Sequence, residues 1–204
     1  MKPTKMLVEE HKVFRQALDS FRLARERMEQ GVNPPVEFLE KAVDFARNYV
    51  DKYHHFKEEY LMFGRLAEKH QSELDAEIEA LRQQHEHSRE FVSEMANALD
   101  GYGNGKDAQI TIMLENLASY TTLLRHHIHR EDNVFYPMVE RDLSQQEMDD
   151  LAELFEKEAA KAGRDVLADM RRVAGELGAL LKASERATVH RRARPRDRRD
   201  HPSR

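Results

Sequence analysis

The sequence contains no cysteine, and glycine (8 residues) and proline (6 residues) are scarce in a chain of 204 residues. The lack of cysteine excludes disulfides, iron–sulfur clusters and thiolate zinc sites. A metal site in this chain would have to use imidazoles and carboxylates, and the 11 His and 38 Asp plus Glu provide ample donors. The scarcity of helix breakers also leaves room for long helices.

Long apolar runs and strand-forming runs of Val, Ile and Thr are missing as well. No apolar stretch approaches the ~20 residues that span a membrane. The first residues, MKPTKMLVEEHK, lack the apolar centre of a signal peptide. Helix formers dominate and 35% of the residues are charged, which is typical of a soluble helical protein. We therefore expect an all-α, cytoplasmic protein without membrane contact.

Charge is distributed unevenly along the chain. Residues 186–204 contain eight Arg, two Asp and no Lys or Glu, a charge of +6, which leaves −11 for the rest of a chain of net charge −5. This segment has almost nothing apolar to bury, so residues 185–204 are predicted to be a disordered Arg-rich tail. Because the tail lacks interleaved aromatic residues, we do not expect it to bind nucleic acid.

Four long helices follow from apolar residues that recur every 3.6 positions and from the breakers between them. The turn at residues 31–35 ends the first helix, and a break in the second is expected near Gly64. The GYGNGKD stretch ends the third helix, and Pro137 follows the fourth. The predicted helices cover residues 4–30, 36–70, 72–100 and 108–136.

A fifth helical segment begins at Ser144, where Ser144 and Glu147 have the spacing of a capping box. It is predicted to run to about Ala183, with Gly163 as a candidate interruption. Short turns between long helices favour an up-down-up-down four-helix bundle. The sequence thus predicts a bundle domain over residues 1–140, a helical extension over 141–184 that packs across the bundle or makes an oligomer contact, and the basic tail.

Histidines occupy the middle of several apolar helix faces. Because helix residues advance by about 100° each, His11, His85 and His127 fall among apolar neighbours on their respective helices, and Glu131 shares the face of His127 one turn later. The second helix is ambiguous. Either His54 with Glu58 or His55 with Glu59 could face inward, and periodicity does not decide between the two pairs.

A metal site explains this convergence better than an ordinary core does. One histidine on an apolar face is usually a core residue with a single hydrogen-bond partner. Four helices that each bring an inward histidine, two of them with a carboxylate one turn away, would bury polar groups at a cost that a cation offsets. We therefore expect these side chains to hold metal.

The motifs resemble those of the hemerythrin-like (HHE cation-binding) family over about residues 4–140. The most specific pieces are the H-F-x-E-E stretch at residues 55–59 and the H-I-x-x-E-D stretch at 127–132, followed by Phe135 and Pro137. The resemblance implies a pair of iron ions with an oxide or hydroxide bridge, with manganese as an alternative. It favours His55 with Glu59 on the second helix, and Glu131 is preferred to Asp132. The implied ligands are His11, His55, Glu59, His85, His127 and Glu131, with Glu58, His54 and Asp132 as secondary candidates.

One departure from the oxygen-carrying members stands out. These proteins place two histidines one turn apart on the third helix, whereas Leu81 and Arg89 flank His85 here. The fifth histidine is therefore predicted to be missing, and water, Glu58, His54 or His70 could fill its position. Tyr120 is the aromatic residue expected nearest to the site.

An additional open position favours reactivity with small molecules. The leading hypothesis is a protein that binds or senses dioxygen or nitric oxide, or that handles iron under oxidative or nitrosative stress. The alternative is an enzyme that acts on peroxide or nitric oxide, or an iron–sulfur repair factor. Ferritin-like iron oxidation is disfavoured because no histidine has a Glu three positions before it.

Overall fold

The computed structural model describes residues 1–68, 72–163 and 165–193, and these residues contain helices and no strand. His70, one of the candidate substitutes for a fifth histidine, lies outside the described residues. Four helical rods form the bundle, and three short segments, labelled η, are π-helical. The first rod is α1 (Pro3–Glu29), and the third is α4 (Ser72–Gly103). The second rod consists of α2 (Val36–Phe45), η1 (Ala46–His55), η2 (Lys57–Met62) and α3 (Phe63–Ala67). The fourth rod consists of α5 (Asp107–Arg130), η3 (Glu131–Phe135) and α6 (Tyr136–Asp142).

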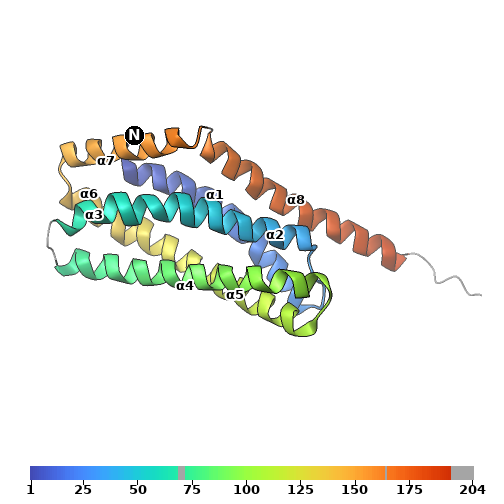
Figure 1. The fold of residues 1–204 in the computed structure, drawn as a ribbon. Coiled ribbons are helices and arrows are strands. Elements are labelled where there is room, and N and C mark those ends of the chain that lie inside the picture. The colour runs from blue at the N-terminus through green and yellow to red at the C-terminus, as the bar shows by residue number, and fades with distance from the viewer. Residues whose placement is uncertain (69–71, 164, 194–204) are drawn as a thin grey trace, which may run out of the picture.

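The rods run up, down, up and down, as the short turns predicted (Figure 1). Gly31 and Gly105 end the first and third rods with positive φ angles of 73° and 70°, which glycine adopts without steric cost. Rods three and four pack closely along their length, and α1 packs against α5. The predicted four-helix bundle is therefore confirmed.

Two rods differ from the prediction in their continuity. The expected break near Gly64 is wrong, because Gly64 lies inside α3 and the second rod continues to Ala67. The fourth rod does not end at Pro137 but continues to Asp142. Pro137 falls in the first turn of α6, directly after the π-helical η3, where a missing backbone N–H disturbs the helix least.

Two further helices follow the bundle. The capping box at Ser144 and Glu147 starts α7 (Gln145–Lys161) as predicted, and Gly163, at a φ of 65°, separates it from α8 (Val166–Ala193). α7 packs against η2 and α1, and α8 lies along α1 and α2. Figure 1 shows α8 running past the end of the bundle.

α8 is longer than predicted. It continues past the expected end at Ala183 into the segment predicted to be disordered, and it reaches Ala193 before Pro195 in the sequence. Arg and Ala are both good helix formers, so the basic composition does not stop the helix. Residues 194–204, the rest of the predicted tail, lie outside the described residues. No helix in the described ranges is long and apolar enough to cross a membrane.

The core of the bundle consists of two apolar clusters with a polar layer between them. One cluster includes Phe14 and Val92, and the other includes Leu7 and Leu81. On α1, His11 lies between Leu7 and Phe14, so each helix passes from one apolar cluster to the other through this polar layer. The apolar clusters exclude water from the polar side chains on both sides.

Candidate metal centre

The polar layer contains two overlapping groups of buried donors. The three-histidine group consists of His55, Glu58, His85 and His127, and the two-histidine group consists of His11, His54, Glu58 and Glu131. Within each group, one donor atom from every residue lies within 4.8 Å of the others. All seven residues are at most 1% exposed. Such a cluster of nitrogen and oxygen donors, closed to solvent, is suited to a transition-metal ion.

Histidine nitrogens approach one another closely in both groups. The Nε2 atoms of His11 and His54 are 2.9 Å apart, and those of His85 and His127 are 3.1 Å apart. The rings of His55 and His85 stack with their centroids 3.7 Å apart. Five imidazoles therefore converge from four rods on one small volume.

Two carboxylates lie between the groups. Oε2 of Glu58 is 3.5 Å from Nε2 of His54 and 3.5 Å from Nε2 of His85. The two oxygens of Glu131 lie near different groups. Oε2 is 3.3 Å from Nε2 of His11, and Oε1 is 3.1 Å from Nε2 of His127. Each carboxylate thus reaches both groups, as a ligand shared by two cations would.

Several donor atoms in this layer are buried without a hydrogen-bond partner among the described residues. They are Oε2 of Glu58, both oxygens of Glu131 and both ring nitrogens of His55. Buried polar atoms in folded proteins are nearly always hydrogen-bonded, because an unpaired one costs free energy. A pair of cations would satisfy these atoms, and their nitrogen and oxygen chemistry fits iron.

Burial also sets the protonation of the site. Desolvation, together with neighbouring positive charge, holds the pKa values of His54 and His85 well below the usual value, and desolvation lowers the pKa of His55 to about 4. These imidazoles are therefore neutral near pH 7, which is the form that binds a metal. Burial and the charge of Glu131 raise the pKa of Glu58 well above the usual range. Burial also opposes ionisation of Glu131, but His127 and His11 outweigh it and hold that pKa well below the usual range.

Four of the five histidines have their second ring nitrogen, Nδ1, paired outside the two groups. Three of these partners are carboxylates. Nδ1 of His11 is 2.8 Å from Asp132, Nδ1 of His54 is 2.8 Å from Glu10, and Nδ1 of His85 is 2.6 Å from Glu59. For His127 the partner is the amide oxygen of Gln84 at 2.8 Å. Metal-binding histidines commonly donate the Nδ1 proton in this way, which fixes the ring and directs Nε2 to the ion.

The family of the chain follows from a comparison with known proteins. The family model for the hemerythrin HHE cation binding domain matches residues 2–139. The chain belongs to this family. The match ends within α6, so α7 and α8 of this hemerythrin HHE protein lie beyond the part that the family model covers.

Similar proteins occur in mycobacteria. Uncharacterized proteins of Mycobacterium tuberculosis and Mycobacterium bovis are 26% identical to this hemerythrin HHE protein over 152 residues, which is 74% of the chain. The aligned part spans only 59% of the length of these relatives. No solved structure matches the chain significantly.

The hemerythrin HHE bundle brings together most of the residues predicted as ligands. His11, His55, His85, His127 and Glu131 all contribute donors to the two groups. Two secondary candidates, Glu58 and His54, also belong to the groups.

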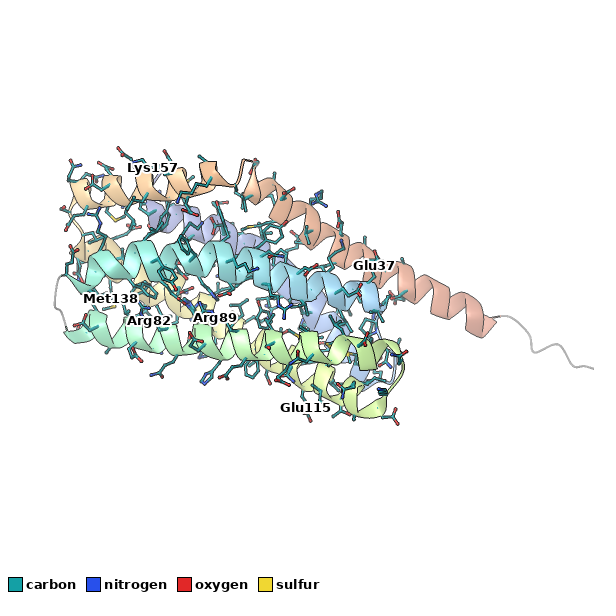
Figure 2. The ribbon with its side chains drawn as sticks, viewed as in Figure 1. Glu37, Arg82, Arg89, Glu115, Met138 and Lys157 are labelled. Carbon is teal, nitrogen blue, oxygen red and sulfur yellow. The ribbon has the colours of Figure 1, made fainter. Side chains whose placement is uncertain are left out.

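Two predicted ligands lie outside the groups instead. The carboxylate of Glu59 pairs with Nδ1 of His85 and with Arg89, and that of Asp132 pairs with Nδ1 of His11. Arg89 is labelled in Figure 2 on α4, where it also contacts Asp51 of the second rod. The structure therefore places the carboxylate of Glu58 in the donor groups, in place of the predicted Glu59.

The third rod contributes one histidine, His85, as predicted, and His54 of the second rod, one of the expected substitutes, is the fifth histidine of the donor groups. The second rod contributes two histidines because the donor atoms of His54 and His55 both lie in the groups. In an α-helix these neighbours would be about 100° apart. η1 and η2 are π-helical, so each residue turns the chain through a smaller angle and adjacent side chains can share a face.

The sequence does contain a signal that Glu58 lies in the groups. His54-x-x-x-Glu58-Glu59 and His127-x-x-x-Glu131-Asp132 have the same pattern of a histidine, a carboxylate one turn later and a second carboxylate next to it. In both, the first carboxylate enters the groups and the second supports a histidine of another rod. Comparing the two segments would have selected Glu58.

The aromatic residue beside the donor groups is Tyr136 and not the expected Tyr120. Tyr120 belongs to the apolar cluster around Phe14 and is not in the polar layer. Tyr136, which the sequence did not single out, donates a hydrogen bond from its hydroxyl to Oε1 of Glu58 at 2.7 Å and stacks on the ring of His11. Its pKa is raised well above the usual value by burial and by Glu131 and Glu58, so the hydroxyl keeps its proton.

Proposed function

We propose that this hemerythrin HHE protein holds two iron ions, one in each group, and binds dioxygen or nitric oxide at one of them. The observation that carries the proposal is the pair of carboxylates, Glu58 and Glu131, whose unpaired oxygens lie between the two sets of histidines. Iron accepts such mixed imidazole and carboxylate sites, and manganese is the alternative metal.

A count of ligands locates the open position. An ion in the three-histidine group would have three imidazoles, the two shared carboxylates and an oxide or hydroxide bridge, about six ligands and a full set. An ion in the two-histidine group would have one imidazole fewer, which leaves one position for a small molecule. Because His54 completes the set of five histidines, the count supports binding of one ligand rather than the more open site expected from the sequence.

The surroundings of the two-histidine group suit a small diatomic ligand. Tyr136 and Asp132, which contact this group, also line a surface groove with Val8 and Pro137. Apolar residues of both core clusters enclose the rest of the layer. Bound iron would supply the electrons for reversible ligand binding, while Tyr136 holds Glu58 in place and keeps a proton on its hydroxyl.

An enzyme that acts on peroxide or nitric oxide is a second candidate. The buried hydroxyl of Tyr136 favours it, because a hydrogen-bond donor this close to the site could stabilise a bound ligand.

The test loads the metal-free protein with Fe²⁺ without oxygen and then measures iron per chain and the absorption spectrum after adding oxygen or nitric oxide. We expect two irons per chain and saturable, reversible spectral changes. Consumption of the added molecule over many equivalents would instead support the enzyme. Fewer than one iron per chain, with correct folding, would contradict the proposed centre. His129→Ala, at an exposed histidine, is the control and should retain both irons.

A further inference from the structure

A buried lysine lies next to the candidate metal centre. Lys57 is 1% exposed, its ammonium group forms an ion pair with Glu10, and it lies 4.0 Å from the ring centroid of Tyr53. Burying an ammonium group is unfavourable unless a partner compensates the charge. Lys57 has no lone pair to offer a cation while it is charged, so a role in the site must act through its partner.

That partner connects Lys57 to the two-histidine group. Glu10 is 5% exposed, and while one of its oxygens accepts from Lys57, the other is 2.8 Å from Nδ1 of His54. His54 directs its Nε2 toward His11 and Glu58. A continuous chain of contacts therefore runs from Lys57 through Glu10 to a histidine of the site.

Two other histidines have comparable chains, but these end at the surface. Asp132, behind His11, contacts Arg15, whose side chain is 41% exposed, and Glu59, behind His85, contacts Arg89, which is 30% exposed. Water and salt weaken the interactions of such exposed cations. Lys57 is the cation whose charge is least screened, so its hold on Glu10 should be the strongest of the three.

The cover over Lys57 comes from outside the region that the family model matches. Phe155 of α7 is fully buried, and its ring centroid is 5.5 Å from the ammonium group. α7 packs on η2, the segment that begins with Lys57. The extension thus closes the bundle over this lysine.

We propose that Lys57 is a positioning residue of the metal centre, which fixes Glu10 against Nδ1 of His54, and that α7 excludes water from this contact through Phe155. The inference rests on the proposed metal centre and extends it to the helix that follows the bundle. It predicts that a change in α7 alters the affinity of the ion in the two-histidine group.

The test measures Fe²⁺ affinity without oxygen, by competition with a chelator, in the full chain. Lys57→Met should lower the affinity for one of the two irons, the ion of the two-histidine group, by about 10- to 100-fold, the range for loss of an outer partner of a metal ligand. Lys57→Arg should restore much of it, and Phe155→Ala should weaken binding in the same direction. Arg15→Met, which removes a half-exposed cation, is the matched control and should change affinity less than threefold.

A double-mutant cycle separates positioning from general stability. If Lys57 acts through Glu10, the Glu10→Gln and Lys57→Met effects on affinity will not add, and the double variant will bind about as weakly as Glu10→Gln alone. Additive effects, or a folded Lys57→Met variant with wild-type affinity, would overturn the inference. If Lys57→Met fails to fold, Glu10→Gln and Phe155→Ala carry the test, and unchanged affinity in both would overturn it. Failure of the wild type to bind two irons would instead contradict the proposed function.

Discussion

The two donor groups differ in how their histidines are supported. In the two-histidine group, both His11 and His54 have a carboxylate at Nδ1. In the three-histidine group, His85 has a carboxylate, His127 has an amide, and Nδ1 of His55 is 3.7 Å from the carboxylate of Asp51, which is too far for a hydrogen bond. A carboxylate partner makes an imidazole a stronger donor. The group with fewer histidines therefore has the stronger donors, which would balance the affinities of the two positions.

The largest effect is expected at the residue that the groups share. Glu58→Ala removes a carboxylate that lies within reach of both sets of histidines, so iron should fall from two per chain to near zero. Metal analysis after desalting measures this. Glu59→Ala, one residue along, should retain at least one iron, because Glu59 only supports His85. Equal loss of iron in both variants would contradict the assignment of Glu58 as the shared ligand and of Glu59 as a support for His85.

The neighbours His54 and His55 are expected to bind different ions. His54→Ala should release the ion of the two-histidine group, which would keep a single imidazole. His55→Ala leaves two imidazoles in the other group and should release less iron. Titration of each variant with Fe²⁺ would resolve the two ions. If both variants lost the same ion to the same extent, the assignment of these neighbours to different groups would be wrong.

Acid should destabilise the metal-free protein. The pKa of His55 is about 4 when folded and 6.5 for the free side chain, so the unfolded chain binds more protons between these values. Stability from this group is complete above pH 6.5 and is lost as the pH falls toward 4, by about 2 kcal/mol at pH 5. Urea unfolding at pH 7 and pH 5 measures the loss. His55→Gln should reduce this pH dependence, and an unchanged slope would contradict the shift.

The smallest effect concerns the orientation of Glu58. Tyr136→Phe removes the hydrogen bond to Oε1 of Glu58 and should cost about 1 kcal/mol of unfolding free energy, with a few-fold loss of iron affinity. Tyr120→Phe, in the apolar cluster, should leave iron affinity unchanged. Chelator competition on both variants compares them. If Tyr120→Phe lowered iron affinity as much as Tyr136→Phe, the hydrogen bond from Tyr136 to Glu58 would not be the cause of the loss.

Helical periodicity predicted the bundle and the inward histidines wherever the helix is regular. His11, His85 and His127 lie in α1, α4 and α5, where the α-helical angle applies, and all three are buried in the groups. It failed on the second rod, because the π-helical segments change the angle between residues there. The choice between Glu58 and Glu59 therefore could not be made from an ideal helix.

Other features depend on contacts that a one-dimensional pattern does not contain. The pairing of Lys57 with Glu10 joins residues 47 positions apart, and Phe155 covers them from a helix that begins after the bundle. In the sequence, Lys57 resembles any other charged residue of an exposed helix face. The packing of α7 on η2, which the sequence pattern does not show, helps to make it a buried cation.

The π-helical turns have a consequence for how this chain tolerates insertions and deletions. A π-helical turn holds more residues than an α-helical one and usually occurs as a short segment at a functional site. Deleting one residue between Ala46 and Met62 would allow the rod to relax to a regular α-helix without breaking it. The rod would remain, but either His54 or His55 would rotate out of the interior, so the length of this stretch is constrained by chemistry and not by folding.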